Sequence, residues 1–268
     1  MTFITRDGVR LAYADTDPGN IDRPSLLLLH GWCHERTSMA AQAAAFRNTH
    51  RVVSVDLRGF GESDAPQQEY TMEAYADDVA WLCEQLKLVK PVVVGHSMGG
   101  NIALELSLHH PHVPRAIVLL DTIVFPPPEL AALVDQMVAA VSGTEYVAMA
   151  NTILGSISLP SDTATRRQLT DALHAPHHVV LSAFRHHNTP RSGQEAASAW
   201  KRPIAYIAAA SKPLADLTEL QRVAPQLQTA RVLGVGHFFP QEDPAQCNAM
   251  IARFFRLLNT AMETEGSQ

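Results

Sequence analysis

Cysteine is scarce in this sequence, and charge of either sign is modest. The three cysteines, Cys33, Cys83 and Cys247, are an odd number without paired spacing. This pattern favours reduced thiols in a cytosolic protein over a disulfide framework. The formal net charge is −6, and the Lys and Arg residues are scattered along the chain. Nucleic-acid binding needs a basic face that neutralises phosphates, so the composition argues against it.

Long apolar stretches are also missing. The N-terminal residues 1–7 contain no segment of signal-peptide length, and no apolar run is long enough to span a bilayer. We therefore expect a soluble, cytoplasmic protein with no membrane partner. At 268 residues with 46% hydrophobic content, the chain fits one large domain with a sizeable buried core.

Short apolar runs, by contrast, recur along the chain. Strands are predicted at 9–13, 25–29, 51–55, 91–94, 116–120, 203–208 and 230–233. Most of these runs are continuous, as in strands buried within a parallel sheet. Helical patterns separate the earlier ones, at 39–46, 72–88 and 99–109. This alternation predicts an α/β fold with a mostly parallel sheet covered by helices on both faces.

The pattern changes after Asp121. Three prolines at 126–128 form a rigid break, and residues 130–200 have helical character without any buried-strand run. Strand character then returns, and an amphipathic helix closes the chain at 241–258. We therefore predict a core formed by residues 1–121 and 201–268, interrupted by a helical cap at 122–200.

One serine stands in a context that favours nucleophilic chemistry. Residues 95–99 read Gly-His-Ser-Met-Gly, the pattern G-x-S-x-G of a nucleophile elbow. The motif directly follows the apolar run 91–94 and directly precedes a helical stretch at 101–106. A strand-to-helix turn this sharp needs glycines beside the serine and lifts its hydroxyl above the sheet edge. Ser97 is the predicted nucleophile.

Two further segments provide what a serine nucleophile requires. The sequence His-Gly-Trp at 30–32 follows an apolar run, and Gly-His-Phe at 236–238 follows the last predicted strand. We predict an oxyanion hole formed by the backbone N–H groups of Trp32 and Met98. His237 is the predicted general base, because a serine hydroxyl is a poor nucleophile until a base removes its proton.

Together with the turn at 56–63, these segments resemble the signature set of the α/β-hydrolase superfamily. They run in the order of that family and span nearly the whole chain. The resemblance implies an α/β-hydrolase fold, with a mostly parallel central sheet, helices on both faces and a helical cap inserted after strand 6. This scaffold hosts many chemistries, so the fold alone does not decide the reaction.

The acid that orients the histidine has two candidates. Most members of the superfamily carry it soon after the strand that follows the cap, but residues 208–213 read Ala-Ala-Ala-Ser-Lys-Pro. Asp216 comes slightly later. Asp121 directly follows the strand at 116–120, an earlier position that some family members use, at the sheet edge where ligands bind. We predict Asp121, with Asp216 in reserve and a helix N-cap as the structural alternative for Asp121.

Several neighbours of these residues are candidates for a substrate pocket. They are His96, Cys33, His34, Phe125 and Phe238. Cap residues at helical spacing are candidates either for an acyl pocket or for plain core, namely Met137, Met149, Ile153, Leu154 and Phe184. The 13 histidines include three adjacent pairs, and adjacent side chains point apart on a helix. We therefore expect no metal and no cofactor.

The predicted function is a serine hydrolase that cleaves a carboxylic ester or a lactone through an acyl-enzyme. The expected partner is a small molecule with an apolar acyl or aromatic part. A non-catalytic ligand receptor on the same scaffold is disfavoured, because the serine, the histidine and an acid are all present.

A second reaction is compatible with the same fold. The segment 30–34, with an acid at Asp121, is similar to the cofactor-independent 2,4-dioxygenases of 3-hydroxy-4-quinolones. This resemblance implies a dyad of His237 and Asp121 that deprotonates the substrate, which then reacts directly with dioxygen. Two positions depart from that pattern: Met98 replaces a second histidine, and Leu57 replaces a tryptophan.

Overall fold

Eight strands form a single sheet in the order β1-β2-β4-β3-β5-β6-β7-β8. The computed structural model describes residues 2–157, 175–187, 201–210 and 213–265. The strands are β1 (Thr2–Arg6), β2 (Val9–Asp15), β3 (Ser25–Leu29), β4 (Arg51–Val55), β5 (Val92–His96), β6 (Ala116–Leu120), β7 (Ile204–Ala208) and β8 (Gln228–Arg231). β2 pairs antiparallel with β1 and β4, and the remaining pairs are parallel. The predicted mostly parallel α/β sheet is confirmed.

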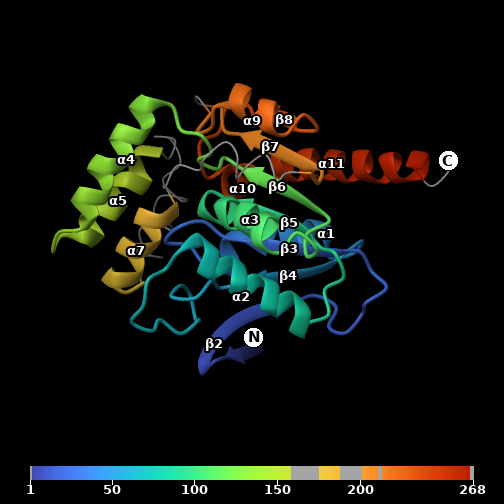
Figure 1. Cartoon of the computed structure of the whole chain (residues 1–268), viewed down its shortest axis with the longest axis horizontal. Coiled ribbons are helices and arrows are strands. Elements are labelled where there is room, and N and C mark those ends of the chain that lie inside the picture. The colour runs from blue at the N-terminus through green and yellow to red at the C-terminus, as the bar shows by residue number, and fades with distance from the viewer. Residues whose placement is uncertain (1, 158–174, 188–200, 211–212, 266–268) are drawn as a thin grey trace.

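Helices cover both faces of this sheet (Figure 1). They are α1 (Ala40–Phe46) after the short 3-10 helix η1 (Arg36–Met39), α2 (Met72–Gln85), α3 (Met98–His109), α9 (Leu217–Val223), α10 (Phe239–Glu242) and α11 (Pro244–Glu265). Between β6 and β7 in the chain, the described residues include three more helices: α4 (Pro128–Val141), α5 (Tyr146–Ile157) and α7 (His177–His187). We call α4, α5 and α7 the inserted helices.

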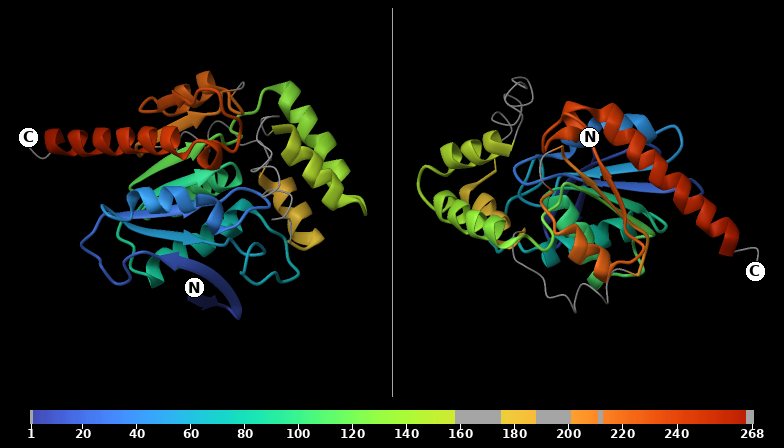
Figure 2. Two further views of the ribbon diagram at one scale, coloured as in Figure 1. Left: turned by 180° about the vertical axis from the view of Figure 1, so that it is seen from behind. Right: turned by 90° about the horizontal axis from the view of Figure 1, so that it is seen from above.

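The continuous apolar runs are explained by the two-residue period of a strand. In β3, Leu27 and Leu29 belong to the core beneath α2 and α3, whereas Leu26 and Leu28 belong to the core beneath α1 and α11. Because both faces are covered, every side chain of such a strand is buried. Burial of each leucine contributes about 1.5–3 kcal/mol. Figure 2 shows α11 on the face opposite α3, with its C-terminal end projecting past the sheet.

The elements that were not predicted from the sequence include β1 and α9. β1 is an edge strand whose residues are exposed or half-buried, so it lacks a continuous apolar run. α9 is only 7 residues long, which is too short for a clear helical period. The helix predicted at 72–88 begins at Met72, as predicted, but ends earlier, at Gln85. Thr71 is its N-cap, and the Thr71 side chain accepts a hydrogen bond from the N–H of Ala74.

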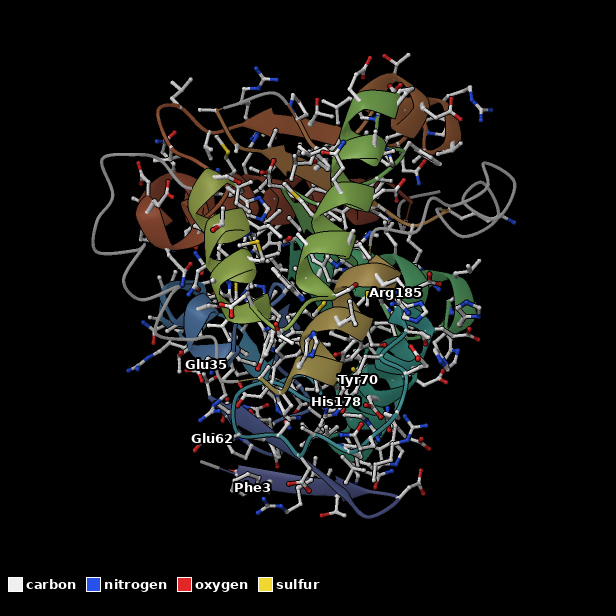
Figure 3. The ribbon with its side chains drawn as sticks, turned by 90° about the vertical axis from the view of Figure 1, so that its left-hand side faces the viewer. Phe3, Glu35, Glu62, Tyr70, His178 and Arg185 are labelled. Atoms are coloured by element: carbon white, nitrogen blue, oxygen red, sulfur yellow. The ribbon has the colours of Figure 1, made fainter. Side chains whose placement is uncertain are left out.

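The inserted helices lie beside the sheet, at the left of Figure 1. Several hydrogen bonds attach α7 to the core. Among them, Trp32 Nε1 donates to the Val180 carbonyl at 2.9 Å, and Tyr70 N donates to Ser182 Oγ at 2.8 Å. Figure 3 looks onto these helices and labels Tyr70 next to His178, whose ring centroids are 5.9 Å apart.

Parts of the predicted cap, residues 158–174 and 188–200, lie outside the described residues. None of the helices in the described ranges combines the length and the apolar character that a membrane crossing requires.

Candidate active site

Ser97 occupies a strained turn between β5 and α3. Its backbone angles are φ 51° and ψ −117°, a conformation that costs a non-glycine residue about 1–3 kcal/mol. The turn is fixed from two sides. Ser97 N donates to the Leu120 carbonyl at 2.9 Å, and Gly100 N donates to the Ser97 carbonyl at 2.9 Å. The strand-to-helix turn expected from the sequence motif is therefore present.

The glycines of this turn are needed for close packing. A Cβ placed on Gly95 would lie 2.2 Å from the carbonyl oxygen of Gly99, and one placed on Gly99 would lie 2.4 Å from the carbonyl oxygen of Leu29. Both neighbours are backbone atoms that cannot rotate away. The first turn of α3 can therefore approach β3 and β5 only without side chains at these two positions.

The structure brings His237 and Asp121 together in a buried pair. His237 Nδ1 lies 2.8 Å from Asp121 Oδ2, and the N–H of Ala209 donates to Asp121 Oδ1 at 3.0 Å. Asp121 is 1% exposed and His237 is 5% exposed. A carboxylate only accepts hydrogen bonds, so the imidazole proton resides on Nδ1 and Nε2 is left free to accept a proton.

The reserve acid has a different partner set. Asp216 is exposed, and its Oδ1 accepts hydrogen bonds from the N–H groups of Thr218 and Glu219 at 2.9 and 3.0 Å. These contacts make it the N-cap of α9. Of the two aspartates, the one that contacts His237 is Asp121.

Ser97 and His237 line one cavity of about 100 Å³. Its other polar lining residues are His34, His96 and His187. The apolar walls come mainly from the inserted helices, with Leu130, Leu133, Val134 and Met137 from α4, Ile153, Leu154 and Ile157 from α5, and Phe184 from α7. A cavity with apolar walls and a few convergent polar groups is typical of a small-molecule site.

The candidate pocket residues divide into two groups. His34, His96, Phe238 and Trp32 line the cavity, as do the cap candidates Met137, Ile153, Leu154 and Phe184. Cys33, Phe125 and Met149 are outside its lining and pack against the larger core instead. Sequence reasoning missed His187 of α7, because its adjacent pair with His186 gave no sign of which side chain faces inward.

The loop that contains Trp32 lies against the serine. A Cβ placed on Gly31 would lie 3.4 Å from Ser97 Cβ and 3.1 Å from His96 Nδ1. Met98 is the first residue of α3, so its N–H is among the helix amides that have no acceptor within the helix. Two backbone amides, of Trp32 and Met98, thus come from segments that flank Ser97.

Three further histidines of the cavity are held neutral by burial. Desolvation lowers the pKa of His34 to about 3 and that of His187 to about 4. It also lowers the pKa of His96 well below its ordinary value. His96 Nε2 donates to the His237 carbonyl at 2.9 Å, and this bond connects the loop that carries His237 to the turn that carries Ser97. Within the described ranges, no group of three or more His, Cys, Asp or Glu side chains is arranged to bind a metal ion.

Known proteins resemble this chain in sequence and in structure. A family model of the α/β hydrolase fold matches residues 24–153. Epoxide hydrolase 4 of Mus musculus is 36% identical over 129 residues, which cover 47% of this chain and 34% of that protein. The chain thus spans about a third of the length of this curated relative.

Two solved structures match nearly the whole chain. A thermophilic esterase from Thermogutta terrifontis is 27% identical with a TM-score of 0.80, covering 96% of this chain and 97% of the esterase. The enol-lactonase from Burkholderia xenovorans is 20% identical with a TM-score of 0.83, covering 95% of this chain and 100% of the lactonase. At 20% identity, the similarity to the enol-lactonase supports only the shared fold.

Proposed function

Since this chain belongs to the α/β-hydrolase superfamily, we propose that it hydrolyses a carboxylic ester or a lactone through an acyl-enzyme on Ser97. One observation carries the proposal. His237, which is paired with the buried Asp121, lines the same cavity as Ser97. A strained serine, a base and an orienting acid are the groups that acyl transfer requires.

Each proposed step follows from the chemistry of these groups. Ser97 Oγ attacks the carbonyl carbon while His237 Nε2 takes the hydroxyl proton, and Asp121 stabilises the resulting imidazolium. The N–H groups of Trp32 and Met98 bind the oxyanion, and losing one such donor typically costs about 3–4 kcal/mol. His237 then returns the proton to the leaving alcohol oxygen, which forms the acyl-enzyme. Water, activated by the same base, releases the acid.

The proposed substrate is a small molecule with an apolar acyl or aromatic part. The support is the apolar wall that α4 and α5 contribute to the cavity. We propose that residues 122–200 form a cap domain over the site. His237 N donates to the Ile157 carbonyl at 3.3 Å, so the last residue of α5 contacts the base-bearing loop. The proposed location is the cytoplasm, consistent with three free, buried cysteines.

The similarity to an epoxide hydrolase raises a different reaction, which the chemistry of Ser97 disfavours. A serine oxygen that opened an epoxide would leave an ether on the enzyme. An ether has no carbonyl for water to attack, so His237 could not complete the cycle. Attack on an ester or lactone instead leaves an acyl-enzyme, which water hydrolyses.

The second candidate is the cofactor-independent dioxygenase of 3-hydroxy-4-quinolones. It is favoured by one observation, that the His237–Asp121 pair is complete without Ser97. In this reaction the dyad would deprotonate the substrate hydroxyl, and Ser97 would only bind. The two candidates therefore differ in whether Ser97 must attack.

A fluorophosphonate probe followed by mass mapping tests the first proposal. We expect the probe to label Ser97, and Ser97→Ala to lower turnover of short aryl esters by several orders of magnitude with an unchanged melting temperature. Equal ester turnover in both proteins would remove Ser97 from the mechanism. Oxygen consumption with a 3-hydroxy-4-quinolone, by a wild type without esterase activity, would select the dioxygenase.

A further inference from the structure

His34 is a buried polar side chain whose ring nitrogens make no hydrogen bond to the described residues. The residue is 4% exposed, and within the described part of the chain neither ring nitrogen has a hydrogen-bond partner. A neutral imidazole has one N–H donor and one acceptor nitrogen. An unpaired buried group of this kind normally destabilises the folded state, because it has lost its hydrogen bonds to water. Such a cost is expected where a ligand supplies the missing partner.

The surroundings of the ring place that partner near the reacting carbon. His34 lines the cavity together with Ser97 and His237. Its ring stacks on His96, the residue before the nucleophile, with centroids 6.0 Å apart. It also contacts Phe238, the residue after the base, with centroids 5.3 Å apart. The ring therefore lies beside the residues that adjoin Ser97 and His237 in the sequence, whereas the apolar walls come mainly from the inserted helices.

We propose that His34 binds a neutral hydroxyl group carried by the substrate on the carbon next to the scissile carbonyl. This inference rests on the proposed ester or lactone hydrolysis and names its substrate class, a 2-hydroxy acyl ester or lactone with an apolar tail. A hydroxyl both donates and accepts, so it matches a ring that has one donor and one acceptor without partners.

The charge of the site selects a hydroxyl over a carboxylate. Burial and the nearby His30 and His237 lower the pKa of His34 to about 3, so the ring is uncharged at neutral pH. A carboxylate beside it would be buried without a counter-charge. Burying an unpaired charge costs far more than burying a hydroxyl that makes its hydrogen bonds.

Three matched esters test the inference on the Ser97→Ala protein, in which they are not expected to be cleaved. They are methyl hexanoate, methyl 2-hydroxyhexanoate and the monomethyl ester of butylmalonic acid. At the carbon next to the ester carbonyl, these three carry a hydrogen, a hydroxyl and a carboxylate, respectively. By titration calorimetry we expect the hydroxy ester to bind roughly 10- to 100-fold more tightly than the unsubstituted ester, as one buried hydrogen-bonding group is worth. The carboxylate ester should bind most weakly.

Substitutions of His34 attribute that preference to its ring. In Ser97→Ala/His34→Leu the hydroxyl preference should fall to about onefold, and in Ser97→Ala/His34→Gln, which keeps a donor and an acceptor, part of it should return. Equal binding of the first two esters by Ser97→Ala, or no measurable binding of the hydroxy ester, overturns the inference. That comparison holds even if the leucine variant does not fold. An unchanged preference in a folded leucine variant also overturns it.

Turnover by the wild type separates this inference from the proposed function. Hydrolysis of both neutral esters with equal kcat/KM, together with equal binding, would leave the function standing and remove the role of His34. A hydroxyl preference in binding that depends on His34, without hydrolysis of any ester, would support the role of His34 and refute the proposed function.

Discussion

The replacement Asp121→Asn exchanges one buried oxygen for an NH₂ group and leaves the shape of the side chain almost unchanged. Asp121 has a φ of 45°, and Asn tolerates this left-handed region at least as well as Asp, so the backbone is not strained. The carboxylate accepts hydrogen bonds on both oxygens, from His237 Nδ1 at 2.8 Å and from Ala209 N at 3.0 Å. The amide can accept on only one side.

Both orientations of the amide damage the site. If its oxygen stays with Ala209, its NH₂ group faces His237 Nδ1, and the imidazole must shift its proton to Nε2, where it can no longer accept one from Ser97. If the amide flips, the NH₂ group meets the N–H of Ala209 and leaves a buried donor unpaired. A comparable replacement in a serine protease triad lowers turnover about 10⁴-fold, which corresponds to about 5 kcal/mol of activation free energy. We expect a loss of this size.

Asp216→Asn is the matched control, because it makes the same chemical change on an exposed helix cap. Asn is about as good an N-cap as Asp, so both the turnover number and the melting temperature should stay near the wild-type values. The assay is the turnover number for short aryl esters, with folding checked by thermal melting. If Asp216→Asn is crippled while Asp121→Asn stays within tenfold of the wild type, the assignment of the acid is wrong.

Three further outcomes are expected. His237→Ala should abolish activity under either proposed reaction, and near-normal activity on the true substrate would point to another base. Gly95→Ala should lower the melting temperature and activity together, because its Cβ would lie 2.2 Å from a backbone oxygen; a fully active, equally stable variant contradicts this. Burial lowers the pKa of His34 to about 3 and that of His187 to about 4, from 6.5. The unfolded chain therefore binds protons below pH 6.5 that the folded chain does not, and the free energy of unfolding falls by about 2 kcal/mol per histidine between pH 8 and pH 5. Denaturant unfolding at these two pH values measures the effect. Between pH 8 and pH 5, the free energy of unfolding of His34→Phe should fall by about 2 kcal/mol less than that of the wild type, and an equal fall would contradict the argument.

Much of the core was predictable because a strand buried on both faces produces a nearly continuous apolar run in the sequence. The runs at 25–29, 51–55 and 116–120 were located to the residue, since a strand covered on both faces buries its side chains on both sides and is therefore mostly apolar. The serine turn was predictable for a related reason. A Cβ placed on Gly95 or Gly99 would lie less than 2.5 Å from a backbone oxygen, so both positions require glycine. Edge strand β1 carries neither signal, since one of its sides faces water.

The cavity wall was less predictable than the polar site. Leu130, Leu133 and Met137 recur at helical spacing, but this period states only that α4 has an apolar face. Whether that face meets a core or a cavity depends on how far the helix stands from its neighbours. For the same reason Phe125, an equally apolar candidate, packs against the core, and the inward orientation of His187 had no local signature.

The position of the proposed acid, Asp121, follows from the adjacency of two strands. β6 and β7 are parallel neighbours, with Leu120 paired to Ile207, so the residues that follow them lie roughly one strand spacing apart, about 4.8 Å. A carboxylate after either strand can therefore reach the same histidine. In this chain the position after β7 contributes the N–H of Ala209, which holds Asp121 from the side that an acid would otherwise occupy. The acid-free stretch at 208–213 and the aspartate at 121 are thus two halves of one arrangement, in which a backbone donor just after β7 fixes a carboxylate just after β6.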